Sequence, residues 1–189
     1  MKKNNEKIMK SEIRLSGSGG QGLITAGIIL AKAAAHEKMR VMQSQSYGPE
    51  SRGGASRADV IISNSKFYHP EATNFDILLS LNQESCDKYS AHLKEDGILI
   101  ADSASVKNIG FLEAKIYEVP FTDICQEKLG TILPTNIMSL AFMVKLTNIV
   151  SGASLRKAVE ETVKERFLEM NNKAIKIGFK LAEDYKKKQ

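Results

Sequence analysis

Short apolar strands alternate with longer helical stretches over most of this chain, and this order constrains the fold more than any other feature. Apolar runs and period-two patterns predict strands, whereas apolar residues three and four apart predict helices. The expected strands are 12–16, 40–46, 55–63, 77–81, 98–102 and 116–119, and the expected helices are 21–37, 83–93, 136–150, 155–166 and 171–187. This alternation predicts an α/β protein, a Rossmann-like layered sheet with helices on both faces and a helical C-terminal third.

Some local features refine this prediction. A turn at Asp96-Gly97 is expected before the strand at 98–102, and Ser154 is the expected N-cap of the helix at 155–166. The helix at 136–150 is apolar around most of its circumference. We therefore expect a self-association or partner surface on a sheet edge or on the helical C-terminal third. The apolar residues that would contribute to it are Ile137, Met138, Leu140, Phe142 and Met143.

The charge of the chain is concentrated in its two tails. The formal net charge is +5, of which residues 1–10 contribute +3 and residues 186–188 another +3, so the remainder is close to neutral. A near-neutral body lacks the basic face that nucleic acids require. Residues 1–10 are expected to be a flexible tail, and residues 11–189 a single domain, because no linker-like segment divides them.

The sequence predicts neither a membrane span nor a secretory signal. No apolar run approaches the roughly 18 residues that a membrane span needs. The first residues are polar and rich in lysine, unlike a secretory signal. These features predict a cytoplasmic protein.

A glycine-rich segment lies between the first expected strand and the first expected helix. It has the pattern G-x-G-x-x-G and consists of Gly17, Ser18, Gly19, Gly20, Gln21 and Gly22. Such a turn brings backbone N–H groups to a helix N-terminus, where they can bind an anion, although it can also serve only as a tight turn. An NAD site needs a carboxylate about 20 residues further on, and residues 40–45 contain none.

A second loop, at residues 45–54, follows the second expected strand. It should reach the same carboxyl edge of the sheet as the glycine segment. It carries an aromatic, a carboxylate and a guanidinium between glycines, and its candidate binding residues are Tyr47, Gly48, Arg52 and Gly53. Arg52 could bind a phosphate or carboxylate through two hydrogen bonds, or it could pair with Glu50.

The remaining reactive residue types form no recognisable site. Cys86 and Cys125 are the two cysteines, too few for a four-cysteine cluster or zinc site, and the three histidines are scattered. No catalytic or metal-binding residue is predicted.

The two loops together resemble the gamma chain of 2-oxoacid:ferredoxin oxidoreductases. The resemblance is carried by Gly-Ser-Gly-Gly-Gln-Gly-Leu-Ile-Thr-Ala at 17–26 and Ser-Tyr-Gly-Pro-Glu-Ser-Arg-Gly-Gly at 46–54, and it continues at 134–138, 167–171 and 174–178. The form of residues 46–50 looks more like the 2-oxoglutarate class than the pyruvate class.

This resemblance implies a subunit that is not active alone. Such complexes convert a 2-oxoacid and coenzyme A to an acyl-CoA, here succinyl-CoA, with carbon dioxide and a reduced acceptor. Thiamine diphosphate and iron–sulfur clusters would reside on partner alpha, beta and ferredoxin-like delta subunits, and ferredoxin or another acceptor would take the electrons. This chain would complete the complex and line the approach of coenzyme A. The alternatives are a subunit acting on pyruvate, a branched-chain 2-oxoacid or indolepyruvate, an independent dinucleotide-binding protein, and a scaffold whose glycine loop binds nothing.

Overall fold

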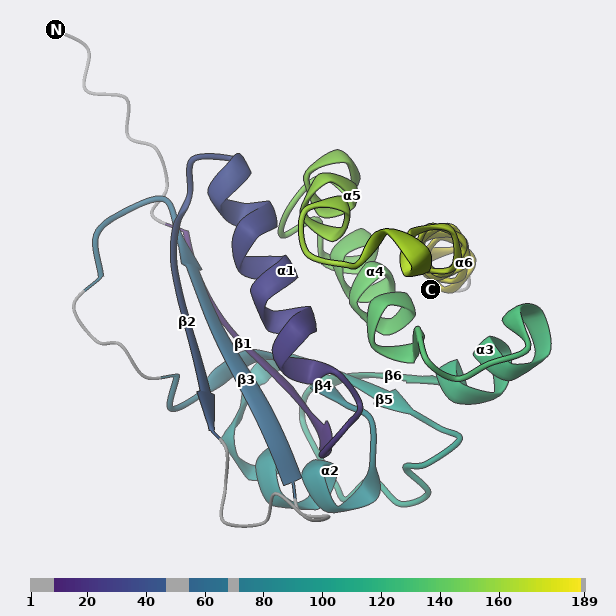
Figure 1. Ribbon diagram of the computed structural model, residues 1–189. Helices are drawn as coiled ribbons and strands as arrows, with labels where there is room; N and C mark the ends of the chain where they lie inside the picture. The colour runs from purple at the N-terminus through teal and green to yellow at the C-terminus, as the bar shows by residue number, and fades with distance from the viewer. Residues whose placement is uncertain (1–8, 47–54, 68–71, 188–189) are drawn as a thin grey trace, which may run out of the picture.

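The computed structural model describes residues 9–46, 55–67 and 72–187 and arranges them around one mixed β-sheet (Figure 1). The strand order across the sheet is β2-β3-β1-β4-β5-β6. The strands are β1 (Lys10–Ser18), β2 (Arg40–Ser46), β3 (Ala55–Ser63), β4 (Phe75–Ser80), β5 (Leu93–Asp102) and β6 (Lys115–Val119). The α-helices are α1 (Leu23–His36), α2 (Gln83–Tyr89), α3 (Phe121–Leu129), α4 (Thr135–Thr147), α5 (Gly152–Glu160) and α6 (Leu168–Lys186), with short 3-10 turns η1 (Ser90–His92) and η2 (Glu165–Phe167).

The sheet is mixed rather than wholly parallel. β1, β4, β5 and β6 run parallel to one another, whereas β3 pairs antiparallel with both β1 and β2. The expectation that both loops follow strands of a parallel sheet was therefore wrong in part. Only eight residues separate the end of β2 from the start of β3. A parallel pair needs a crossover connection of about a dozen residues or more, so this short connection favours an antiparallel pair.

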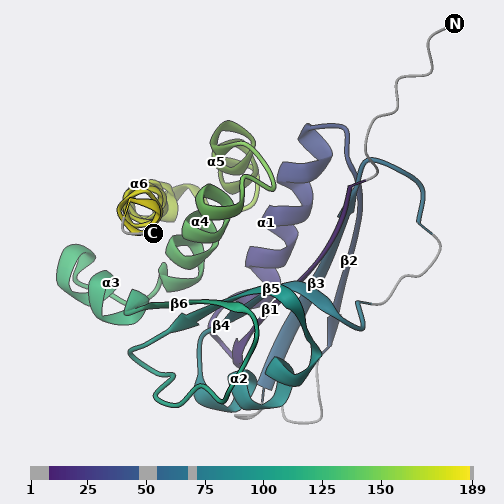
Figure 2. The ribbon, with the colours of Figure 1, turned by 180° about the vertical axis from the view of Figure 1, so that it is seen from behind.

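Helices cover the two faces of the sheet unequally. α1, α4, α5 and α6 lie on one face, and α2 lies on the other (Figures 1 and 2). Alternation along β1 follows from the pleat: Ile13 and Leu15 enter the core beneath α1 and α4, so Arg14 projects to the α2 face. The smaller core on that face includes Phe75, Leu78 and Tyr89. The prediction of an α/β fold with helices on both faces and a helical C-terminal third is confirmed.

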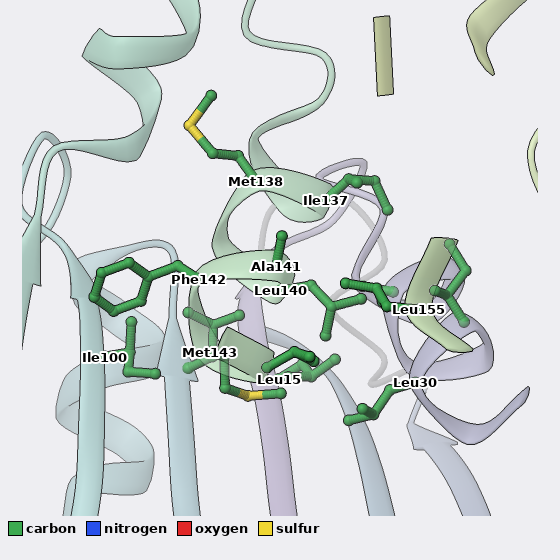
Figure 3. Packing of buried hydrophobic residues seen from close by; sticks show 14 of the residues in the cluster. Leu15, Leu30, Ile100, Ile137, Met138, Leu140, Ala141, Phe142, Met143 and Leu155 are labelled. Carbon is green, nitrogen blue, oxygen red and sulfur yellow. The ribbon is translucent and has the colours of Figure 1, made fainter. Parts of the chain in front are cut away.

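α4 is the centre of the larger core. Every residue from Thr135 to Val144 is buried, and Figure 3 shows Phe142 and Met143 directed toward Ile100 and Leu15 of the sheet. α6 packs on the outer side of α4, where Gly178 approaches the backbone of Met138. The expectation that Ile137, Met138, Leu140, Phe142 and Met143 would leave a partner surface on this helix is wrong, because the chain's own sheet and α6 cover them.

Several element boundaries differ from the prediction. β5 continues through Asp96-Gly97 where a turn was expected, because a shift in its register with β4 absorbs these residues. α5 begins three residues earlier than predicted, and Ser151, not Ser154, is its N-cap; the Ser151 hydroxyl accepts the N–H of Ser154 at 3.1 Å. α3 was not predicted, since only Phe121 and Cys125 of this largely polar helix are buried.

Candidate functional site

The carboxyl edge of the sheet brings together the ends of strands that are distant in the sequence. β1, β4 and β5 are parallel and end at the same edge, where α/β folds commonly bind ligands. Ser18, at the end of β1, pairs with Ala55 at the start of β3, and Ser46, at the end of β2, pairs with Arg57. The glycine segment and both ends of the second loop therefore lie at this one edge.

The glycine segment has a backbone that other residues adopt only with strain. Gly20 has φ = 88° and Gly22 has φ = 72°, both in the left-handed region. Gly17 is constrained by packing instead, because an added Cβ would overlap the side-chain oxygen of Gln21. The glycines thus set a tight strand-to-helix connection, as the sequence pattern predicted.

Side chains of the glycine segment and its neighbours form hydrogen bonds with this segment. Gln21 Oε1 accepts the Ser18 N–H at 2.6 Å, and Gln21 Nε2 donates to the carbonyl of Leu81 at 3.4 Å. Asn82 Nδ2 donates to the hydroxyl of Ser18 at 2.7 Å. Gln21 is therefore a brace between β1 and β4. Its own side chain uses the Ser18 N–H, which leaves that group unavailable to an anion in this conformation.

Asn136 is a further residue of this site, from α4. Its Nδ2 donates to the carbonyl of Gly22 at 3.0 Å, and its Oδ1 accepts the N–H of Ile137 at 2.9 Å. An added Cβ on Gly22 would lie 2.5 Å from this Nδ2. Reasoning from residue types did not single out Asn136. The only signal was its place in the Pro-Thr-Asn segment at 134–136.

The start of α1 keeps donors available for an anion. Gly22 is the N-cap of α1, and no side-chain hydrogen bond caps this helix end. The first N–H groups of a helix have no partner within the helix. Among the described residues, the N–H groups of Gly20, Gly22 and Leu23 donate no hydrogen bond to another residue. These three donors are consistent with a phosphate site at a helix N-terminus.

A small cavity of about 130 Å³ adjoins the glycine segment. Gly20, Gln21, Leu81, Thr122 and Thr135 contribute to its lining, together with Ile132 and Leu133. Ile132 and Leu133 are 53% and 69% exposed, although they are large apolar residues. Donors and apolar surface thus lie next to each other at this edge.

The second predicted loop lies outside the described residues. This applies to Tyr47, Gly48, Glu50, Arg52 and Gly53 alike. Their predicted roles are not tested by the geometry, and only the positions of Ser46 and Ala55 at the carboxyl edge bear on where the loop emerges.

The cysteines are buried and free of disulfides, and burial raises the pKa of both thiols. Among residues 9–46, 55–67 and 72–187, no group of three or more histidine, cysteine, aspartate or glutamate side chains could hold a metal ion. In the same residues, no helix has the length and apolar character needed to cross a membrane.

The mixed sheet with a glycine loop at its carboxyl edge defines the chain as an α/β protein with a candidate anion site at the start of α1. The chain belongs to the pyruvate ferredoxin/flavodoxin oxidoreductase family, whose sequence model matches residues 12–181. It is 40% identical to the 2-oxoglutarate synthase subunit KorC of Methanocaldococcus jannaschii over 179 residues, which cover 93% of this chain and 96% of that relative.

Two further relatives place the chain within this family. The crystal structure of the gamma subunit of a keto/oxoacid ferredoxin oxidoreductase from Geobacter sulfurreducens has a TM-score of 0.82 and 44% identity, covering 91% of this chain and 98% of that one. The pyruvate synthase subunit PorC of Methanothermobacter marburgensis is 32% identical, covering 89% of this chain and 95% of that relative. The resemblance seen in the two loops is confirmed at the level of the family.

Proposed function

We propose that this chain is the gamma-type subunit of a 2-oxoglutarate:ferredoxin oxidoreductase. The observation that carries the proposal is its 40% identity to a 2-oxoglutarate synthase subunit over nearly the full length of both chains. The reaction joins 2-oxoglutarate and coenzyme A to give succinyl-CoA and carbon dioxide, and two electrons pass to the acceptor. A pyruvate-class subunit is the second candidate, supported by the 32% identity to a pyruvate synthase subunit.

The cofactors of this chemistry belong to partner chains in the proposal. With two cysteines in the whole sequence, this chain has too few thiolates for a four-cysteine cluster. Thiamine diphosphate, which would stabilise the carbanion during decarboxylation, and the iron–sulfur clusters are assigned to alpha, beta and ferredoxin-like delta subunits. Residues 11–189 act as one unit of this cytoplasmic complex.

This chain's own contribution in the proposal is to hold coenzyme A. The N–H groups of Gly22 and Leu23 lie at the N-terminus of α1, which favours negative charge, and that of Gly20 lies two residues earlier in the turn. The remainder of the segment, Gly17, Ser18, Gly19 and Gln21, shapes this turn, and Tyr47, Gly48, Arg52 and Gly53 belong to the loop expected beside it. Phosphate groups of coenzyme A suit such a set of donors.

The proposed function is tested by reconstitution. The full chain alone should show no oxidation of any 2-oxoacid with an artificial electron acceptor, because it lacks cluster ligands and thiamine-binding residues. Co-expression with the partner subunits should give succinyl-CoA formation, with 2-oxoglutarate used at a higher kcat/KM than pyruvate, 2-oxoisovalerate or indolepyruvate. Equal activity of the isolated chain would overturn the proposal, and preference for pyruvate would favour the second candidate.

The coenzyme A site is tested separately in the assembled complex. Arg52→Ala should raise the KM for coenzyme A by about 10- to 150-fold, which corresponds to one charge-assisted hydrogen bond of about 1.5–3 kcal/mol. Arg52→Lys should restore part of the loss if the contact uses two hydrogen bonds. Glu50→Ala is the matched variant, because equal damage from it would mean that Arg52 only pairs with Glu50 and shapes the loop. An unchanged KM in an assembled Arg52→Ala complex rules out this role.

A further inference from the structure

A polar pocket of about 670 Å³ opens on the α2 face of the sheet, and no residue of the glycine segment lines it. Its lining includes Arg14, Arg57 and Asp59 from β1 and β3, and Tyr89 and His92 from the end of α2 and the following turn. A volume of this size is typical of small-molecule sites. None of its lining residues belongs to the proposed coenzyme A site.

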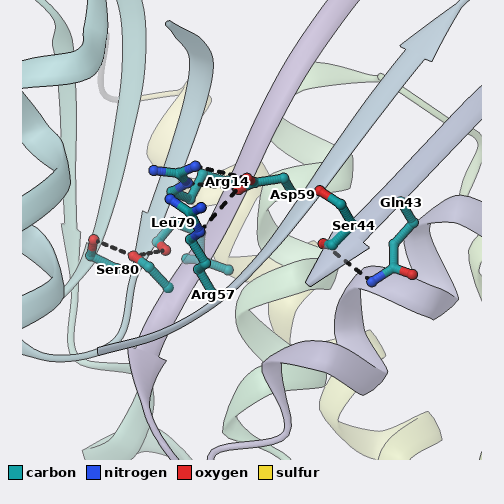
Figure 4. Close-up of polar contacts among 8 residues, drawn as sticks. Arg14, Gln43, Ser44, Arg57, Asp59, Leu79 and Ser80 are labelled. Carbon is teal, nitrogen blue, oxygen red and sulfur yellow. Dashed lines mark hydrogen bonds and ion pairs between the residues drawn. The ribbon is translucent and has the colours of Figure 1, made fainter. Parts of the chain in front are cut away.

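Arg14 is held rigidly at the base of this pocket. It is 4% exposed and pairs in register with Asp59 on the neighbouring strand. Its Nε and Nη2 donate to the two carboxylate oxygens of Asp59 at 2.6 and 2.7 Å (Figure 4). Its guanidinium lies 4.0 Å from the ring centre of Phe75 and 4.6 Å from that of Tyr89. The orientation of the guanidinium is therefore fixed before any ligand arrives.

The pairing with Asp59 leaves Arg14 with unused donors. A guanidinium has five N–H groups, and the bonds to Asp59 occupy two of them. Among the described residues, no acceptor faces the other three. No described side-chain nitrogen or oxygen is both sealed from solvent and without a partner, so Nη1 of Arg14 reaches the open space of the pocket. A buried cation thus presents free donors to a cavity.

The charge around these donors is positive. Asp59 is the one carboxylate among the described lining residues, and Arg14 already neutralises it. Arg57 adds a second guanidinium, whose side chain is 37% exposed and whose Nε lies 4.0 Å from Oδ2 of Asp59, the oxygen that also accepts Nη2 of Arg14. Asn74 and His92 add further hydrogen-bonding groups to the lining. A pocket of this composition attracts an anion with oxygen acceptors.

We propose that this pocket binds a small oxyanion, a phosphate or a carboxylate, through the free edge of Arg14 and the guanidinium of Arg57. A buried Arg–Asp pair that served only the fold would gain little over apolar side chains of the same volume. The cavity over its free donors gives the pair a use beyond packing.

The test is a titration of the full chain with sodium phosphate and with sodium succinate, each against sodium chloride at equal ionic strength. NMR signals of the Arg14 and Arg57 Nε–H groups and of the Tyr89 and His92 rings should shift and saturate. The salt with the lower Kd identifies phosphate or carboxylate as the preferred group. Arg57→Gln should weaken binding by about tenfold or more. Lys173→Gln, which removes an exposed cation of α6, should leave the Kd unchanged.

A second variant tests Arg14 without leaving a lone buried charge. Arg14→Gln combined with Asp59→Asn replaces both partners, so the folded state keeps a neutral pair. This double variant should keep its cooperative thermal transition and lose saturable binding. Shifts that follow ionic strength alone would overturn the proposal. So would an Arg57→Gln chain that binds both anions as tightly as the parent, a result that remains decisive if the double variant does not fold.

Discussion

At the scale of single residues, Asp102 is the most strongly enclosed acidic group of the carboxyl edge. Its side chain is fully buried at the end of β5. It accepts the Thr122 hydroxyl at 2.5 Å and the Ala104 N–H at 3.2 Å. Burial raises the pKa of Asp102, and these hydrogen bonds oppose the change only in part. The carboxylate connects the end of β5 to the first turn of α3.

This raised pKa predicts a pH-dependent stability. Above the ordinary value of 3.8, the unfolded chain loses the Asp102 proton before the folded chain does, so its contribution to the free energy of unfolding falls as pH rises through the folded pKa. In Asp102→Asn this contribution does not change with pH, because asparagine does not titrate. The stability of this variant relative to the parent should increase between about pH 4 and pH 7, by about 1.4 kcal/mol for each unit of pKa difference. Urea unfolding at several pH values measures this.

The matched variant for this experiment is Asp96→Asn, whose side chain is exposed on the same strand. It should show a smaller pH-dependent change than Asp102→Asn. A stability difference between Asp102→Asn and the parent that stays constant from about pH 4 to pH 7 would contradict the prediction.

The turn made by the glycine segment could be predicted from its residues, but the hydrogen bonds that distant residues make to it could not. Gly20 and Gly22 have left-handed φ values, which glycine adopts without the steric cost that a Cβ brings. This local requirement is therefore visible in the sequence as a pattern of glycines. The bond from Asn136 to Gly22 joins residues 114 positions apart. Such a contact depends on how α4 packs, and no local pattern specifies it.

At the scale of elements, periodicity predicted most strands and helices but not every relation between them. The bounds of β2 and β3 were predicted fully, yet their antiparallel pairing was not, because strand direction depends on the connection at 47–54 and not on the apolar pattern. α3 escaped detection because its two buried side chains, Phe121 and Cys125, are too few to give a helical period.

The contact between α4 and α6 depends on one glycine. Gly178 is buried in the middle of α6, and an added Cβ would overlap the carbonyl oxygen of Met138 and lie 3.0 Å from the Cβ of Ala141. Backbone atoms cannot move aside as a flexible side chain does. The small residue therefore permits the two helices to approach closely.

Gly178→Ala should consequently destabilise the protein, although alanine is the better helix former by about 1 kcal/mol. Overpacking against backbone commonly costs about 1–3 kcal/mol, and we expect a net loss of that order in the free energy of unfolding. Lys176→Ala, an exposed change two residues earlier in α6, is the control and should change stability by less than about 0.5 kcal/mol. A Gly178→Ala protein more stable than the parent would contradict the close contact.

At the scale of the whole molecule, α4 joins the sheet to the helical C-terminal third. Phe142 packs edge-to-face against Phe121 of α3 at 5.4 Å and against Tyr185 of α6 at 5.5 Å between ring centres. The Sδ atom of Met138 lies 3.8 Å from the Sγ atom of Cys125. Because α4 contributes to contacts with the sheet, α3 and α6 together, these elements share one core. A partner subunit must therefore bind elsewhere on the chain.

Hydrogen exchange of the full chain measures this directly. Amides of α4 should open only with global unfolding, at a free energy that equals the stability of the whole chain, roughly 5–15 kcal/mol for a domain of ordinary stability. Amides of the edge strand β2 should exchange faster through local opening, because one side of this strand has no neighbour among the described strands. Protection of α4 should not increase when the partner subunits assemble, since its side chains are already enclosed. Faster exchange of α4 than of β2 in the isolated chain, together with a gain in the complex, would mean that α4 is a partner surface after all.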